Sequence, residues 1–146
     1  VGTDIAGSVR LPCAQNGLVG LKPSRGRIPH LAPSPIRAAG PMARNVNDLC
    51  LLMSVLVGED HRDFEAAPAC NSREFLTITE TSESFLKDKR IGLMLDVGFG
   101  PKTDRRIVDL INEQARILGS LGAKIEIVTK LTKINHIYRQ EVRVLL

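Results

Sequence analysis

The chain has 146 residues, of which 43% are hydrophobic and 25% are charged, and its formal net charge is +4 at pH 7. This is enough for one ordinary domain with a core, and the composition is typical of a soluble globular protein. Four Phe, one Tyr and no Trp leave few side chains to stack on bases, and basic residues are interleaved with acidic ones. These features argue against a nucleic-acid groove, and no apolar run is long enough to cross a membrane.

The stretch from Gly2 to Pro12 (GTDIAGSVRLP) is where the sequence indicates chemistry. It predicts the end of a strand, a turn of small residues, a serine and the start of a short helix. Because Ala6 and Gly7 lack bulk, another molecule can approach the backbone closely there. If a helix begins after Ser8, its first N–H groups have no intrahelical partner and carry partial positive charge, which would stabilise an oxyanion beside the hydroxyl.

This local pattern leaves other interpretations open. Small residues before a serine suit a helix N-cap or a phosphate cradle equally well. Asp4 and Arg10 bracket the turn, and an ion pair between them would brace it. Cys13 is a rival nucleophile, but it lies about 140° around a helix from Ser8, so the two side chains cannot easily serve one oxyanion hole.

Two further blocks follow the serine turn, namely Gly17–Arg27 (GLVGLKPSRGR) and Gly40–Leu49 (GPMARNVNDL). With the first block, in this order and spacing, they make nearly the whole chain resemble the amidase signature family. Members of this family hydrolyse amide C–N bonds with a Ser–Ser–Lys triad. The resemblance implies that Ser8 is the acylated serine. It also implies an oxyanion hole built from the backbone N–H groups of four consecutive residues, Ile5, Ala6, Gly7 and Ser8.

The chain departs from the family pattern in two places. Many members have glycine where this chain has Ala6; an alanine keeps the N–H, and the hole survives if the backbone there does not need a positive φ. The family's lysine and second serine lie upstream of the nucleophile block, and nothing in the chain matches them. Because the chain starts at Val1 inside its reactive motif and the family is roughly three times longer, we expect a fragment that is close to inactive alone.

The apolar run Leu18–Leu21 predicts a short buried strand, and Lys22 follows it. A desolvated lysine can activate a serine, so Lys22 is weighed as a general base. Its place beside Pro23, and the absence of a triad role for this block in the family, favour a structural or phosphate-like ion-pair role instead.

Residues 28–40, with three prolines, predict an irregular surface loop, which in the family runs close to the active-site mouth. His30 is expected to be solvated. Neither a histidine nor a carboxylate stands near it at metal-ligand spacing, and Cys13, Cys50 and Cys70 lack such spacing too, so no metal is assigned. Reduced thiols are consistent with a cytoplasmic protein.

Asn45 is a predicted N-cap for a helix that ends at Gly58. Its apolar face comprises Val46, Leu49, Cys50, Met53 and Val57, widened by Leu52 and Leu56. Residues 59–86 have no lasting periodicity. They predict a linker with one short helix near Arg73–Phe75 and an exposed His61.

The second half predicts a β–α–β unit. Arg90–Leu95 is a buried strand, and Lys124–Val128 a second one parallel to it. Between them Thr103 caps a helix with apolar positions Ile107, Leu110, Ile111, Leu118 and Leu121, closed by Gly122. The loop Asp96–Lys102 lies at a strand's carboxyl end, where ligands bind, but its glycines do not form a dinucleotide motif. The tail Ile134–Leu146, which contains His136, predicts another helix.

The sequence therefore predicts an α/β fold, a partial amidase-signature fold with a mixed or parallel β-sheet flanked by helices. We expect one fragment of a single amidase domain, with a nucleophile block (1–58), a linker (59–86) and a β–α–β part (87–146). The predicted function is hydrolysis of a small-molecule amide without a cofactor, with a homodimer left open. The alternatives are a non-catalytic module that binds an anion at the serine turn, and one subunit of an amidotransferase that acts on glutamyl-tRNA.

Overall fold

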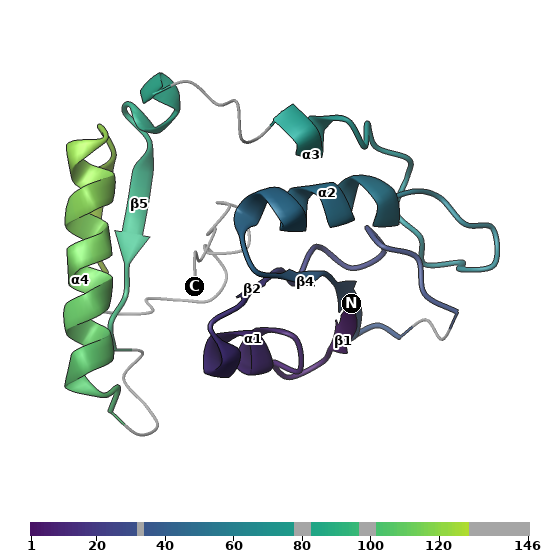
Figure 1. The fold of residues 1–146 in the computed structure, drawn as a ribbon, viewed down its shortest axis with the longest axis horizontal. Coiled ribbons are helices and arrows are strands. Elements are labelled where there is room, and N and C mark those ends of the chain that lie inside the picture. The colour runs from purple at the N-terminus through teal and green to yellow at the C-terminus, as the bar shows by residue number, and fades with distance from the viewer. Residues whose placement is uncertain (32–33, 78–82, 97–101, 129–146) are drawn as a thin grey trace. The chain divides into compact units, whose positions relative to one another are not determined.

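A computed structural model describes residues 1–31, 34–77, 83–96 and 102–128 of the chain. The chain divides into two compact units, Val1–Thr81 and Ser82–Leu146 (Figure 1). Within the described residues, the strands form three two-stranded sheets, two antiparallel ones in the first unit and a parallel one in the second.

The first unit pairs strands that are distant in sequence. Strand β1 (Gly2–Asp4) runs antiparallel to β3 (Ala38–Gly40), with Asp4 opposite Ala38. Strand β2 (Val19–Gly20) runs antiparallel to β4 (Met42–Ala43). Two predictions need correction here. The strand expected over residues 18–21 is only two residues long and half-buried, and the loop expected over residues 28–40 ends in the fully buried strand β3.

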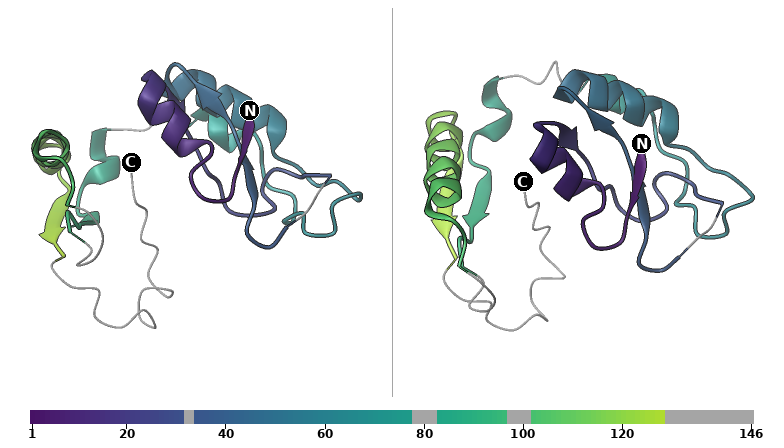
Figure 2. Two further views of the ribbon diagram at one scale, coloured as in Figure 1. Left: turned by 90° about the horizontal axis from the view of Figure 1, so that it is seen from below. Right: turned by 60° about the horizontal axis from the view of Figure 1, so that its bottom comes forward.

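Three helices complete the first unit: α1 (Arg10–Asn16), α2 (Val46–Leu56) and α3 (Glu74–Thr77). Strands β2 and β4 lie between α1 and α2, as Figure 2 shows from two further directions. The predicted cap of α2 is confirmed, because the Asn45 side chain accepts the Asp48 N–H at 2.8 Å. Gly58 follows the C-cap residue Val57, so it stands at the C′ position expected of it, although the cap is extended and the φ of Gly58 is not positive.

The core of the first unit lies against α2. Its buried members are Ile28, Ala39, Met53 and Val57, and Met53 keeps only 1% of its surface exposed. Burial of one such side chain stabilises a fold by about 1.5–3 kcal/mol. Four half-buried residues pack against this cluster: Leu21, Leu56, Cys70 and Phe75. Cys50, predicted as a small core residue, is buried, and all three cysteines are free thiols.

The second unit confirms the predicted β–α–β pattern. After a 3-10 turn (Glu83–Leu86), strand β5 (Arg90–Leu93) runs parallel to β6 (Lys124–Ile127), and α4 (Arg105–Ser120) connects them. The prediction of a buried strand is wrong for β5, which is two residues shorter than expected and has no buried residue. The cap of α4 is one residue later than predicted. Asp104, not Thr103, accepts a backbone N–H, that of Arg106 at 2.8 Å. A carboxylate is also favoured at a helix N-terminus by the helix dipole.

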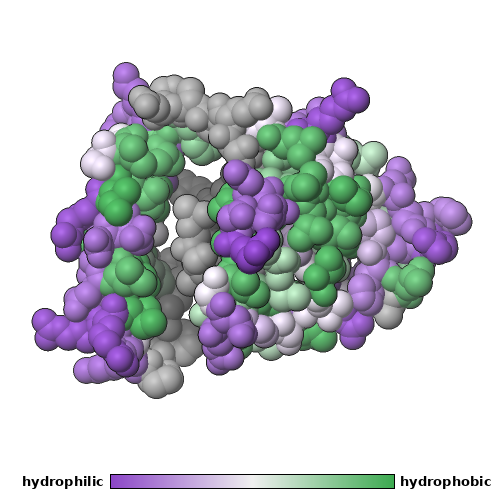
Figure 3. All heavy atoms as spheres, in the orientation of Figure 1, coloured by the Kyte–Doolittle hydropathy of each residue, from purple (hydrophilic) through white to green (hydrophobic). Residues whose placement is uncertain are grey.

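No residue of α4 is buried, and Ile107, Leu110 and Ile117 keep about half of their surface exposed. Apolar side chains gather along α4 beside its charged ones (Figure 3). The helix predicted for residues 134–146, with His136, and most of the loop 96–102 lie outside the described residues. In the described part of the chain, none of the helices combines the length and apolar character needed to cross a membrane.

Candidate active site

The serine turn connects β1 to α1, as the sequence predicts. Gly7, at its centre, has φ +107°, a conformation that favours glycine. Asp88 is the only non-glycine residue with positive φ among those that the structure describes, so Ala6 does not need one. The backbone condition for an alanine at this position is therefore met. The side chain of Ser8 is exposed at the end of the turn.

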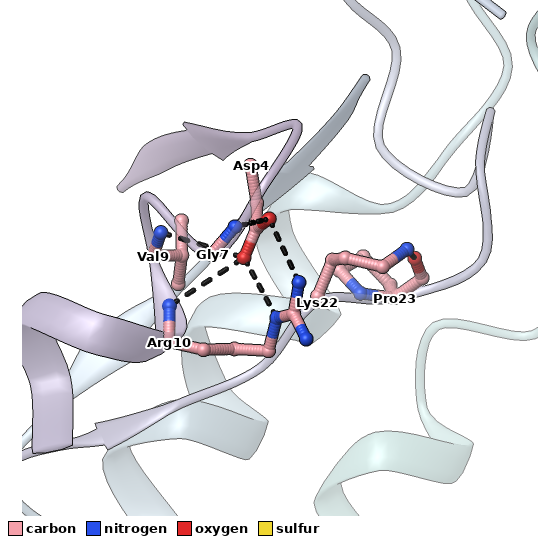
Figure 4. Close-up of polar contacts among 6 residues, drawn as sticks. All are labelled: Asp4, Gly7, Val9, Arg10, Lys22 and Pro23. Atoms are coloured by element: carbon pink, nitrogen blue, oxygen red, sulfur yellow. Dashed lines mark hydrogen bonds and ion pairs between the residues drawn. The ribbon is translucent and has the colours of Figure 1, made fainter. Parts of the chain in front are cut away.

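A single buried carboxylate organises this turn from beneath. Asp4 has no exposed surface, and it accepts five hydrogen bonds (Figure 4). Its Oδ1 accepts the Gly7 N–H at 2.7 Å, and its Oδ2 accepts the N–H groups of Val9 at 3.4 Å and Arg10 at 3.5 Å. The Arg10 guanidinium donates Nε to Oδ2 at 2.9 Å and Nη2 to Oδ1 at 3.1 Å. The predicted Asp4–Arg10 ion pair is thus confirmed, in a two-pronged geometry.

The electrostatics of the pair follow from this geometry. The Arg10 side chain holds the pKa of Asp4 well below its ordinary value, an effect that outweighs the opposing desolvation of the buried carboxylate. The backbone N–H groups of Gly7 and Arg10 lower the pKa of Asp4 further. Reciprocally, Asp4 raises the pKa of Arg10. The carboxylate beneath the turn is therefore ionised throughout the neutral pH range.

The amide groups of the turn are not equivalent. The predicted oxyanion hole includes Gly7, but its N–H is donated to Asp4 and is not free in this conformation. The Gly7 carbonyl accepts the Leu11 N–H at 2.8 Å. Because the N–H and C=O of a trans peptide point in opposite directions, the Ser8 N–H points away from α1. Among described residues, the N–H groups of Ile5, Ala6 and Ser8 find no hydrogen-bond acceptor, so three predicted donors remain available.

The start of α1 differs from expectation in a related way. The helix has seven residues and begins at Arg10, with Val9 as an N-cap residue that makes no side-chain cap. The sequence predicts unpartnered N–H groups here, facing the serine. In the structure the N–H groups of Val9 and Arg10 are directed at Asp4 instead. The site already contains its own anion, which weakens the interpretation of the turn as a cradle for a bound one.

The two rival catalytic side chains do not join the site. Cys13 is 2% exposed and lies against β2, where a Cβ placed on Gly20 would come within 2.6 Å of its Sγ. The Lys22 side chain is exposed, and its Nζ donates to the Pro23 carbonyl at 3.3 Å (Figure 4). The ion pair predicted for Lys22 does not form with any described residue. Cys13 is therefore a packing residue.

A second buried carboxylate was missed by the sequence interpretation. Asp63, 6% exposed, accepts the N–H groups of His30 and Glu65, each at 2.9 Å. It ties residues 59–67 to the loop that precedes β3. His30 is half-buried, not solvated as predicted, whereas His61 is exposed as predicted. The adjacent cavity of about 10 Å³ has room for about one water molecule and for no substrate.

His, Cys, Asp and Glu side chains do not gather into a candidate metal site anywhere in the described ranges. The serine turn offers hydroxyl and amide groups, backed by one ionised carboxylate whose charge Arg10 balances, and this set suits acyl transfer.

Known proteins resemble this chain over most of its length. A family model described as Amidase matches residues 1–145. The chain is 35% identical over 130 residues to a glutamyl-tRNA(Gln) amidotransferase subunit of Clostridium botulinum, covering 86% of this chain and 26% of that protein. It superposes on a bacterial aryl acylamidase of the amidase signature family with a TM-score of 0.73 and 34% identity, covering 87% of this chain and 26% of that one.

A further solved structure, 6-aminohexanoate cyclic dimer hydrolase complexed with substrate, gives a TM-score of 0.71 at 29% identity, with 87% of this chain and 27% of that chain covered. The chain thus spans about a quarter of the length of the curated relatives it matches.

Proposed function

Because the chain belongs to the amidase signature family, we propose that it carries the nucleophile of an enzyme that hydrolyses amide C–N bonds, with Ser8 as the acylated residue. Its fold is part of the α/β fold of that family, as the sequence predicts. The observation that carries the proposal is the exposed Ser8 hydroxyl beside amide groups that donate to no described residue.

The proposed reaction has two halves. Ser8 Oγ forms a bond to the amide carbonyl carbon, and the carbonyl π electrons move to oxygen. The N–H groups of Ile5, Ala6 and Ser8 would donate to that oxyanion. The serine proton passes through a relay, formed by the second serine and the lysine of the triad, to the amide nitrogen. The C–N bond breaks as the proton arrives, and the amine leaves. Water then hydrolyses the ester, which releases a carboxylic acid and regenerates the hydroxyl.

The relay is the part that this chain does not supply. The family resemblance implies a second serine and a lysine, and no residue of the chain matches them. Nucleophile, base and orienting group act as a unit, so removal of the base costs several orders of magnitude in rate. We therefore propose that the 146 residues alone are close to inactive. Turnover of an aryl amide by the purified chain, abolished by Ser8→Ala, would overturn this part.

The nucleophile itself is tested in a longer protein that contains this chain together with the second serine and the lysine implied by the family resemblance. The test is labelling with a fluorophosphonate, which reacts with activated serines. We expect label on Ser8 and none in Ser8→Ala. Ser120→Ala is the matched control. Ser120 is also exposed, but its hydroxyl donates to the Ile117 carbonyl on α4, and labelling should be unchanged. Label on another serine, or saturable phosphate binding without any label, would reject the assignment.

A second candidate is favoured by the similarity to the amidotransferase of Clostridium botulinum. In that case the acyl-enzyme step would release ammonia from an amide donor, and the ammonia would be passed on to glutamyl-tRNA. The measurement is ammonia release from glutamine compared with release of an aryl amine from an aryl amide. Glutamine turnover that depends on Ser8, with no aryl amide turnover, would support the transferase.

A further inference from the structure

The Asp4 carboxylate lies directly beneath the turn where a negative charge would develop. Its two oxygens bind the Gly7 N–H and the first N–H groups of α1, so they connect the middle of the turn to the helix that follows (Figure 4). Val9, between these points, has no exposed surface. The turn is therefore held at its middle and at its C-terminal end by one buried group.

This arrangement orients the exposed amides indirectly. With the Gly7 N–H bound to Asp4 and the Gly7 carbonyl bound to the Leu11 N–H, both peptide planes that flank Gly7 are fixed. The second of these planes carries the Ser8 N–H, which is thereby held away from α1. A donor that is fixed before the reaction stabilises an oxyanion more than one that must reorient.

The same contact has an electrostatic cost. A buried negative carboxylate raises the energy of a second negative charge placed nearby, and low local polarity enlarges that repulsion. The Arg10 guanidinium binds both carboxylate oxygens, at 2.9 and 3.1 Å, and so returns the pair to a net charge of zero. Of the other elements around Asp4, β3 carries no titratable group; α1 adds the Cys13 thiol, and the exposed Lys22 follows β2.

We propose that Asp4 is a positioning residue that fixes the amides of the serine turn, and that Arg10 prevents the charge of Asp4 from opposing the oxyanion. This rests on the proposed function of Ser8. The two roles predict losses of different size, because loss of Asp4 removes both the brace and the charge, whereas loss of Arg10 leaves the charge uncompensated.

The experiment measures kcat, KM and the rate of fluorophosphonate labelling of Ser8 in the longer protein. Removal of a preorganised oxyanion interaction typically costs about 10²–10³-fold in kcat. For Arg10→Gln we expect kcat to fall by about 100-fold with KM changed less than about threefold, because the interaction acts on the transition state. Adding Asp4→Asn should recover about tenfold, since it removes the uncompensated charge and keeps an acceptor for Gly7. A double variant no faster than Arg10→Gln would overturn the electrostatic role.

Two further variants keep the test decisive. Arg10→Lys keeps the positive charge and loses the two-pronged geometry, so we expect kcat within about tenfold of the parent; a loss equal to that of Arg10→Gln contradicts charge compensation. If Arg10→Gln fails to fold, Arg10→Lys alone carries the comparison. The matched control is Arg62→Gln, which breaks an exposed two-pronged pair with Asp60, and its kcat should be unchanged.

The outcomes separate this inference from the proposed function. If Ser8 is not labelled in the parent protein, the proposed function fails. If Ser8 is labelled and Asp4→Asn labels at the parent rate, only the positioning role fails. We expect Asp4→Asn alone to slow labelling by about tenfold, because an amide retains one acceptor oxygen but binds the Gly7 and α1 N–H groups less strongly.

Discussion

In the unit Val1–Thr81 the ion pair that shapes the structure is built on Asp4, a carboxylate with no exposed surface. In the unit Ser82–Leu146 the cross-strand pair Arg90–Glu126 has equally short contacts, 2.7 and 2.8 Å, but both side chains are about half exposed or more. The two units differ in the same way in how far their apolar side chains are buried. The first unit encloses Met53 and Val57, whereas α4 buries none of its residues.

The comparison shows that the distances within an ion pair do not by themselves measure its contribution to stability. A pair in water is screened and contributes little to stability, whereas a buried carboxylate must keep its partners or remain uncompensated. The same argument applies to glycines, because the effect of replacing a glycine on the free energy of unfolding depends on the atoms that surround it. Four substitutions or conditions test this contrast, from the largest expected effect to the smallest.

The largest effect is expected at Gly40 of β3. A Cβ there would overlap the Leu21 carbonyl oxygen, which is backbone and cannot move away. We expect Gly40→Ala to lower the free energy of unfolding by about 4 kcal/mol or more, as overpacking against backbone does. Chemical denaturation measures it, with Gly58→Ala as a control because nothing lies within 4 Å of its Cβ position. Equal stability of the two variants would contradict the packing of β3.

The pair built on the buried Asp4 comes next. Asp4→Asn leaves the Arg10 guanidinium without a charged partner and weakens three backbone hydrogen bonds, so we expect a loss of about 2–4 kcal/mol. In the second unit, Glu126→Gln removes an exposed partner of Arg90 and should change stability little. The comparison is made by denaturant unfolding of both variants. Similar losses at the two sites would remove the distinction between buried and exposed pairs.

The pH dependence of stability sharpens the same point. Because the folded-state pKa of Asp4 lies below its unfolded value of about 3.9, the stability that Asp4 contributes is fully present above that pH and is lost as pH falls through the lower folded pKa. We therefore expect Asp4→Asn to lose less stability than the parent below about pH 4. Asp60, whose pKa Arg62 also lowers, keeps 25% of its side chain exposed and pairs with an exposed arginine, so Asp60→Asn should change the acid dependence less than Asp4→Asn does.

The smallest effect is a gain. Gly119 lies in α4, and a Cβ there would make only an ordinary contact, 3.8 Å from Ile125. Alanine is the better helix former, so we expect Gly119→Ala to raise the free energy of unfolding by about 0.5 kcal/mol. A thermal melt measures the shift. A loss of stability would mean that α4 packs more tightly than its exposed side chains indicate.

Local patterns were enough for several features. The periodicity of α4 and the apolar runs on either side predict the β–α–β unit, and Asn45 predicts the start of α2. The small residues around Gly7 predict the serine turn, and the spacing of Asp4 and Arg10 predicts their pair. Each of these depends on residues close together in the chain, so the sequence contains the cause.

Other features depended on distant segments. Strand β3 consists of Ala38, Ala39 and Gly40, small residues with little strand preference, and it forms because β1 pairs with it across more than thirty residues. The hydrogen bond from the His30 N–H to the Asp63 carboxylate likewise joins two loops. No local sequence pattern predicts either contact.

The order of residues therefore determined the helices α2 and α4, the strands β5 and β6, and which serine follows the turn. The tertiary structure decided that the Gly7 N–H is donated to Asp4, that Asp4 is buried with Arg10 across both its oxygens, and that Ser8 remains exposed. The physical reason is that periodicity and capping act between neighbours, whereas burial sets the cost of every unpaired polar group and is fixed only when remote strands pack together.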